Sequence, residues 1–199
     1  MGTAHILVHR LKVAYESHGD GRAILFIHGW AGSRLHWNDA PIFLKNYRII
    51  ALDLYGFGDS EEPFHVSTPE SYVGQVCDFI KQLGTEDAVL VGHSVGGLIA
   101  ANVALRISEN VRALVLMEAP VGKELEAIKC PILLIFGDRH SLLEGLPRIE
   151  VANKQLSYNS KAELCFIEKA GHNPMLENAS KFYTALNDFC ETLLRNHNS

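Results

Sequence analysis

The feature that most restricts the fold of this chain is an alternation of short apolar runs with amphipathic stretches. Mainly apolar runs occupy residues 23–29, 47–54, 87–92, 111–118, 130–137 and 162–168. Unbroken apolar runs, rather than alternating ones, are typical of strands that are covered on both faces, as in a parallel sheet. The runs therefore predict a mostly parallel β-sheet with helices on both sides.

Amphipathic stretches supply the predicted helices. The first extends from an N-cap at Thr68, with Pro69 at its first helical position, to a C-cap at Gly84. Residues 94–107 predict a second helix, and residues 180–195 predict a third, in which Phe182, Leu186, Phe189 and Leu193 recur at helical spacing.

An antiparallel pair of strands is predicted near the N-terminus, where apolar and polar residues alternate on both sides of Arg10. The strands and helices that follow alternate along the chain, which is typical of a doubly wound α/β sheet with right-handed crossovers. Functional sites in such sheets form at the carboxyl ends of the strands.

The composition fits one globular domain over residues 1–199, with 47% hydrophobic and 21% charged residues. The net charge of −5 and the lack of a basic cluster argue against nucleic acid or an anionic membrane as a partner. We see no secretory signal and no apolar run of membrane-spanning length. Four isolated cysteines favour free thiols in a reducing compartment, so we expect a cytoplasmic protein.

The segment Gly92-His93-Ser94-Val95-Gly96 matches the pattern G-x-S-x-G between a predicted strand and a predicted helix. Glycine at both ends of the pattern leaves room for a strained turn that presents Ser94. The helix that follows provides unpaired N–H groups, and the N–H of Val95 is placed to face a developing oxyanion. This context predicts that Ser94 is a nucleophile.

A serine hydroxyl needs a base to become a good nucleophile. Among ten histidines, His172 lies in a loop after the last predicted strand, which puts it at the carboxyl edge of the sheet. His28 ends a strand in the segment FIHGWAG, where we interpret it as a structural residue that shapes the loop. The N–H of Trp30 in the same loop is the second expected oxyanion donor.

Five motifs in this order, HGWAG, DLYGFGDS, GHSVGG, CPILLIFGD and AGHNPMLE, resemble the α/β-hydrolase fold family. The resemblance covers almost the whole chain and implies an eight-stranded, mostly parallel sheet flanked by helices. It also implies Ser94 as nucleophile and His172 as base, with Trp30 and Val95 as the oxyanion donors.

The motif DLYGFGDS is similar to the pattern D-x-P-G-x-G-x-S of that family, with Tyr55 in place of the usual proline. We interpret Asp53, Gly56 and Gly58 as residues that form the turn.

The triad acid departs from the family pattern. The resemblance places an aspartate three residues after the glycine that ends the seventh strand, and that position after Gly137 is His140. Two carboxylates remain as candidates. Glu118 ends the sixth strand, where some branches of the family, including haloalkane dehalogenases, carry the acid, and Asp138 directly follows Gly137. We expect Glu118→Gln to impair turnover strongly and Asp138→Asn to change it little.

The second departure concerns the lid. Members of this family commonly carry a long insertion between the sixth and seventh strands, whereas only residues 119–129 stand there in this chain. We therefore expect a minimal lid or none, and an open pocket ringed by Trp30 together with Trp37 or Phe57. A homodimer of this chain is one arrangement that would cover the open site.

These features predict a cofactor-free serine hydrolase, most simply a carboxylesterase that cleaves small esters through an acyl-enzyme. Hydrolysis of a thioester, a lactone or a C–C bond would use the same residues. The alternative from another class is a catalytically weak binding or receptor-like protein, which His140 at the usual acid position favours. The histidines and cysteines show no spacing typical of a metal site, so no metal is expected.

Overall fold

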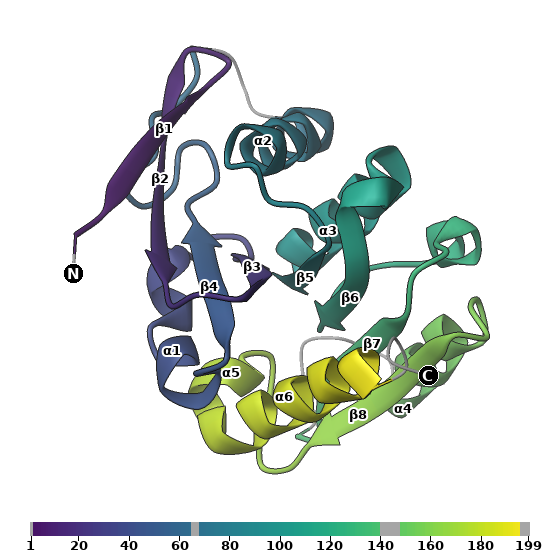
Figure 1. Cartoon of the computed structure of the whole chain (residues 1–199). Helices are drawn as coiled ribbons and strands as arrows, with labels where there is room; N and C mark the ends of the chain where they lie inside the picture. The colour runs from purple at the N-terminus through teal and green to yellow at the C-terminus, as the bar shows by residue number, and fades with distance from the viewer. Residues whose placement is uncertain (1, 65–67, 140–147, 196–199) are drawn as a thin grey trace.

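The computed structural model describes residues 2–64, 68–139 and 148–195 (Figure 1). One eight-stranded sheet has the strand order β1-β2-β4-β3-β5-β6-β7-β8. The antiparallel pairings are β1 with β2 and β2 with β4, and the other neighbours are parallel. The strands are β1 (Ala4–Val8), β2 (Leu11–His18), β3 (Arg22–Ile27), β4 (Tyr47–Leu52), β5 (Ala88–His93), β6 (Val111–Met117), β7 (Ile132–Gly137) and β8 (Ala162–Ile167). The predicted fold class is confirmed.

The predicted N-terminal antiparallel pair is also present. Val8 in β1 pairs with Leu11 in β2, and the two residues between them, His9 and Arg10, have φ angles of 49° and 69°. Two consecutive positive φ angles are typical of the tight hairpin turn whose twist matches that of the strands.

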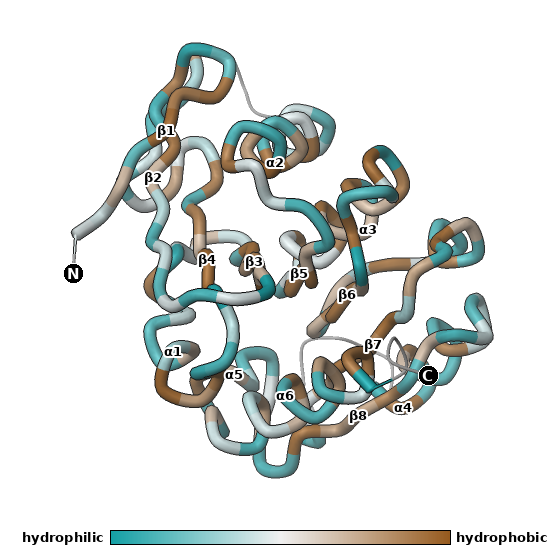
Figure 2. Tube along the Cα trace, viewed as in Figure 1, coloured by the Kyte–Doolittle hydropathy of each residue, from teal (hydrophilic) through white to brown (hydrophobic). Residues whose placement is uncertain are grey.

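Helices cover both faces of the sheet, and each face has its own apolar core (Figures 1 and 2). Side chains of α2, α3 and α4 enter one core, and side chains of α1, α5 and α6 enter the other. The helices are α1 (Ala40–Phe43), α2 (Pro69–Gln82), α3 (Val95–Arg106), α4 (Arg148–Leu156), α5 (Pro174–Glu177) and α6 (Ala179–Arg195). Short 3-10 helices are η1 (Arg34–Trp37), η2 (Ser108–Asn110) and η3 (Lys123–Ala127).

The three predicted helices are present as α2, α3 and α6. The Thr68 hydroxyl accepts a hydrogen bond from the N–H of Ser71, which caps the start of α2, and Pro69 is its first residue. Gly84 follows the C-cap residue Leu83 with a φ of 62°, the left-handed conformation that ends many helices.

The chain between β6 and β7 forms η3 and lies against the body of the protein. Leu125 of η3 is fully buried in the core on the α3 side. The amide of Asn159 donates to the carbonyl oxygens of Leu125 (2.6 Å) and Ile128 (2.9 Å). This segment therefore packs as part of the main domain instead of projecting as a separate cap.

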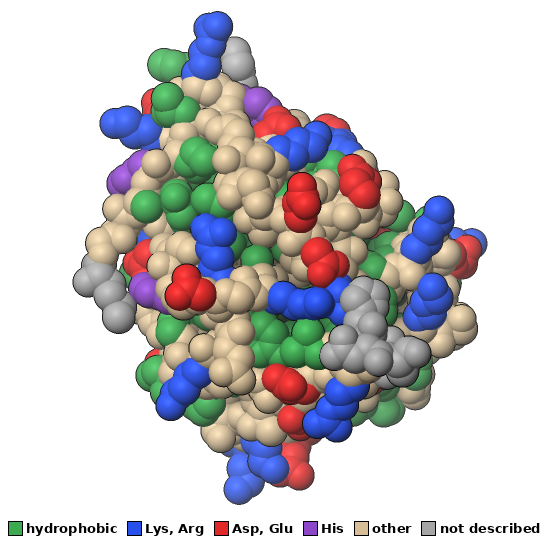
Figure 3. Space-filling model, viewed as in Figure 1, with side chains coloured by type: hydrophobic (Ala, Val, Ile, Leu, Met, Phe, Trp, Pro, Cys, Tyr) green, Lys and Arg blue, Asp and Glu red, His purple; other side chains and the backbone are tan. Residues whose placement is uncertain are grey.

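Within the described ranges, no helix is long and apolar enough to cross a bilayer. On the face shown in Figure 3, basic side chains are interspersed with acidic ones and with apolar groups.

Candidate active site

The candidate nucleophile Ser94 occupies the single residue between β5 and α3. Its φ of 51° and ψ of −122° are strained for a residue with a side chain, at a cost of about 1–3 kcal/mol. Its N–H donates to the carbonyl of Met117 at 2.8 Å, which continues the pairing of β5 with β6 into the turn. The sheet therefore holds the strained turn in place.

A glycine is required two residues further along the chain, at Gly96. A Cβ atom on Gly96 would lie 2.4 Å from the carbonyl oxygens of both Ile27 and His28, so the backbone of α3 approaches the end of β3 directly. This close contact sets the start of α3 against the loop that follows β3. The first N–H groups of a helix have no acceptor within the helix, and the N–H of Val95 is the first in α3.

The loop after β3 passes beside Ser94. A Cβ atom on Gly29 would come within 3.1 Å of Ser94 Cβ, and Trp30 is the next residue. The Trp30 side chain is 70% exposed, and its ring meets Phe57 edge to face at a centroid distance of 5.3 Å. Of the two alternatives beside Trp30, Trp37 or Phe57, the choice of Trp37 is wrong. Trp37 is 1% exposed, because η1 turns it into the core against Phe26.

His28 has the structural role that the sequence predicts. It is fully buried, its Nε2 accepts the N–H of Leu54 at 3.0 Å, and its Nδ1–H donates to the Gly29 carbonyl at 2.7 Å. Burial lowers the pKa of His28, which keeps the ring neutral and suited to donate through one nitrogen and accept through the other. His28 thus joins the loop after β3 to the loop after β4.

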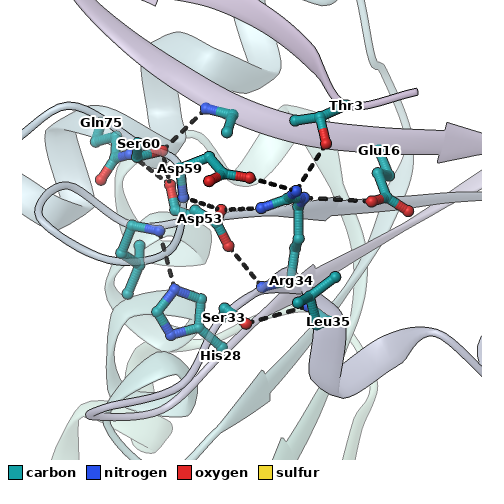
Figure 4. A network of polar contacts seen from close by, with 12 residues as sticks. Thr3, Glu16, His28, Ser33, Arg34, Leu35, Asp53, Asp59, Ser60 and Gln75 are labelled. Carbon is teal, nitrogen blue, oxygen red and sulfur yellow. Dashed lines mark hydrogen bonds and ion pairs between the residues drawn. The ribbon is translucent and has the colours of Figure 1, made fainter.

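A buried ion pair supports the same two loops (Figure 4). The Asp53 carboxylate accepts the N–H of Arg34 (2.6 Å) and of Asp59 (2.9 Å), and it contacts the Arg34 guanidinium. That guanidinium also reaches Asp59 (2.7 Å) and Glu16 (3.3 Å). Asp53 is therefore the centre of a network, which extends its predicted role as a turn former. Sequence reasoning did not single out Arg34, because an arginine in a loop carries no pattern that predicts burial.

The candidate base His172 lies in the loop between β8 and α5. The Glu177 carboxylate accepts the N–H of Gly171 (2.9 Å) and of Asn173 (3.0 Å), the two neighbours of His172. On the other side, His93 Nε2–H donates to the His172 carbonyl at 2.8 Å, and the two imidazole rings are 4.9 Å apart. Sequence reasoning missed Glu177, although a proline followed by an acidic residue in the first turn is a helix-start signal.

Glu118 follows β6 directly and brings a carboxylate to His172. Its Oε2 lies 3.8 Å from His172 Nδ1, and its side chain is 4% exposed. Its Oε1 accepts the N–H of Gly137 at 2.7 Å and lies 3.4 Å from Arg148 Nη1. A positive φ of 49° at Glu118 turns the chain sharply at this point. The carboxylate is therefore fixed on one oxygen while the other faces the histidine.

Asp138 has a different environment. Its side chain is exposed, and its described hydrogen bond is made by the backbone N–H, which donates to the Ile167 carbonyl at 3.1 Å. His140, at the usual acid position, lies outside the described residues.

Arg148 at the start of α4 is a member of the site that sequence reasoning missed. Its Nη1 donates to the carbonyls of Gly137 (3.3 Å) and Arg139 (2.8 Å) and lies near Glu118. Within the part of the chain that the structure describes, no group of three or more His, Cys, Asp or Glu side chains is placed to hold a metal ion.

Comparison with known proteins gives the family. The sequence model of the alpha/beta hydrolase fold matches residues 22–136. A 2-hydroxy-6-oxo-6-(2'-aminophenyl)hexa-2,4-dienoic acid hydrolase from Metapseudomonas resinovorans is 37% identical over 112 residues, which cover 54% of this chain and 39% of that protein. The chain spans 30–46% of the length of the curated relatives that it matches.

Solved structures agree on the fold. A "predicted CIB-like hydrolase" from Thermoplasma acidophilum superposes with a TM-score of 0.85 at 21% identity, over 96% of this chain and 98% of the other. A thermophilic esterase from Thermogutta terrifontis gives a TM-score of 0.85 at 18% identity, over 97% and 99% of the two chains. The chain belongs to the alpha/beta hydrolase fold family.

Proposed function

We propose that this protein is a serine hydrolase that cleaves small carboxylic esters through an acyl-enzyme. Ser94 is the nucleophile, His172 the general base and Glu118 the triad acid. The observation that carries the proposal is the strained turn at Ser94, at the N-terminus of α3, whose neighbour His93 hydrogen-bonds to the backbone of His172. The buried Glu118 carboxylate lies 3.8 Å from Nδ1 of that histidine. Separations of this size are common in ligand-free sites, where catalytic hydrogen bonds tighten on binding.

The reaction has two halves. In the first, Ser94 Oγ attacks the ester carbonyl carbon while His172 takes the hydroxyl proton and then passes it to the leaving alcohol. In the second, His172 takes a proton from the water that attacks the acyl-enzyme, and it passes this proton to Ser94 Oγ as the carboxylic acid is released. The N–H groups of Val95 and Trp30 stabilise the oxyanion that forms in each half.

Glu118 orients His172 and stabilises the imidazolium that forms in each half-reaction. Its geometry suits this role, because the Gly137 N–H occupies one oxygen and leaves the other toward His172 Nδ1. A carboxylate that is 4% exposed interacts with a nearby positive charge more strongly than one in water. Asp138, with an exposed side chain, is the weaker candidate for the acid.

Small esters are the proposed substrates because the segment between β6 and β7 packs as part of the main domain. In addition, Trp30 of the loop after β3 (residues 28–33, here called the oxyanion loop) forms an apolar pair with Phe57. The esterase from Thermogutta terrifontis shares the fold. The relative from Metapseudomonas resinovorans is a dienoic acid hydrolase, so cleavage of a C–C bond by the same residues is the second candidate.

A series of p-nitrophenyl esters of increasing acyl length tests the proposal. We expect the highest kcat/KM for the shortest acyl chains and a fall as the chain lengthens. Ser94→Ala should abolish this activity while retaining the fold. If short esters are not cleaved above the rate of Ser94→Ala, whereas a vinylogous diketone is cleaved at its C–C bond, the ester proposal fails in favour of the second candidate.

A further inference from the structure

We propose that His93 is a positioning residue that anchors the backbone of the base, His172, to the strand that carries the nucleophile. The contact is the hydrogen bond from His93 Nε2 to the His172 carbonyl oxygen at 2.8 Å. It joins residues that are 79 positions apart in the sequence. Its catalytic consequence rests on the proposed hydrolase function, whereas its structural consequence does not.

His93 is attached to a rigid part of the fold. It is the last residue of β5, it pairs with Met117 of β6, and it is 4% exposed. Ser94 is the next residue, so any shift of the His93 backbone also moves the nucleophile. A bond from this side chain to His172 therefore fixes base and nucleophile relative to one another.

The surroundings of the ring define its protonation. Among the described residues, His93 Nδ1 has no hydrogen-bond partner, and it is buried. A Cβ atom on Gly29 would lie 2.8 Å from this nitrogen, so the backbone of the oxyanion loop covers it. A proton on Nδ1 would have no acceptor there, and burial lowers the pKa of His93 to about 4. The proton is therefore carried by Nε2, which donates to the carbonyl.

The ring of His93 consequently lies between two loops of the site. Gly29 of the oxyanion loop contacts it on the Nδ1 side, and His172 contacts it on the Nε2 side. A second described contact of the loop that carries His172 (residues 168–173) comes from the Glu177 carboxylate, which is on an exposed residue and accepts from the two neighbours of His172. The hydrogen bond from the buried His93, in contrast, is made to the backbone of His172 itself.

Precise placement of the base matters because a displacement of about 1 Å in an active site can lower the rate by about 100-fold. Loss of the His93 hydrogen bond should therefore reduce kcat more than it changes KM, since substrate binding does not require the proton transfer. If His93 acted through packing alone, the loss of kcat among variants at this position would follow the change in side-chain volume.

The test compares His93→Met with His93→Gln. Both side chains are unbranched and similar in length, but only glutamine has an N–H near the position of His93 Nε2. We expect His93→Met to lower kcat for a short ester by about 10- to 100-fold, with KM changed less than about 2-fold. His93→Gln should recover most of that loss. His5→Met, at an exposed histidine, is the matched control and should behave as the parent protein.

Hydrogen exchange over residues 168–178 gives a second readout that does not depend on activity. We expect faster exchange in this segment for His93→Met than for His93→Gln and the parent protein. If methionine and glutamine give the same kcat and the same exchange, the positioning role is refuted. If exchange separates the two variants but the parent protein hydrolyses no ester, the anchor stands and the proposed function fails.

Discussion

Replacing Glu118 with glutamine is the sharpest perturbation of the proposed triad. Glutamine has nearly the same shape, and its Oε1 can still accept the Gly137 N–H that Glu118 accepts at 2.7 Å. The amide NH₂ then faces His172 Nδ1 in place of the carboxylate oxygen at 3.8 Å. The substitution therefore removes a charge and an acceptor while leaving the turn and the packing in place.

The size of the effect follows from the distance. Two unit charges 3.8 Å apart interact by about 4 kcal/mol at an effective dielectric constant of about 20. This energy is available only when His172 is an imidazolium, so it lowers the barrier and not the energy of the resting enzyme. The Arg148 guanidinium, 3.4 Å from the same carboxylate, already offsets part of it. We therefore expect kcat/KM to fall by about 10²- to 10³-fold.

The assay is steady-state hydrolysis of p-nitrophenyl acetate, with circular dichroism and thermal unfolding to confirm that the variant is folded. Asp138→Asn is the control, and because its side chain is exposed we expect kcat/KM within about 2-fold of the parent protein. The reverse ranking, with Asp138→Asn impaired and Glu118→Gln active, would refute the assignment of Glu118 as the acid.

Three further predictions concern stability. Burial lowers the pKa of His93 from 6.5 to about 4, so between these values the unfolded chain binds a proton that the folded chain does not. In urea titrations, the free energy of unfolding should therefore fall by about 2 kcal/mol from about pH 7 to about pH 4.5. An equal fall in His93→Gln would contradict this. Gly96→Ala places a methyl group 2.4 Å from backbone carbonyl oxygens and should lower the free energy of unfolding by about 3 kcal/mol or more. In the control Gly74→Ala the added Cβ meets nothing closer than 3.7 Å, so thermal melts should show an unchanged or higher stability. Arg34→Met leaves the buried Asp53 carboxylate without its cation and should lower the free energy of unfolding by about 3–5 kcal/mol, so an unchanged melting temperature would disprove the importance of the ion pair.

The sequence predicts the strands and the turn at Ser94 well, because their determinants are local. Continuous apolar runs and flanking glycines identify a covered strand wherever it lies in the chain. The helix α4 (Arg148–Leu156) was not predicted. Its buried residues include Arg148 and Gln155, and polar side chains on the inner face hide the helical pattern.

The sequence leaves both Glu118 and Asp138 as candidates for the acid, because they follow neighbouring strands of the sheet. It depends on the path of each loop. The positive φ at Glu118 turns its side chain inward, whereas the N–H of Asp138 bonds to β8 and its side chain is exposed. Trp37 was misplaced for a similar reason, since a short 3-10 helix after the oxyanion loop turns it into the core.

We propose that Ser94 is an activated acyl-transfer nucleophile. Incubation with a fluorophosphonate, followed by intact-mass and peptide mass spectrometry, tests it directly. We predict one adduct per chain, located on Ser94 and absent in Ser94→Ala, with labelling much slower in His172→Ala. A folded parent protein that stays unlabelled, or that is labelled equally in Ser94→Ala, would contradict the claim and favour a binding protein built on a hydrolase fold.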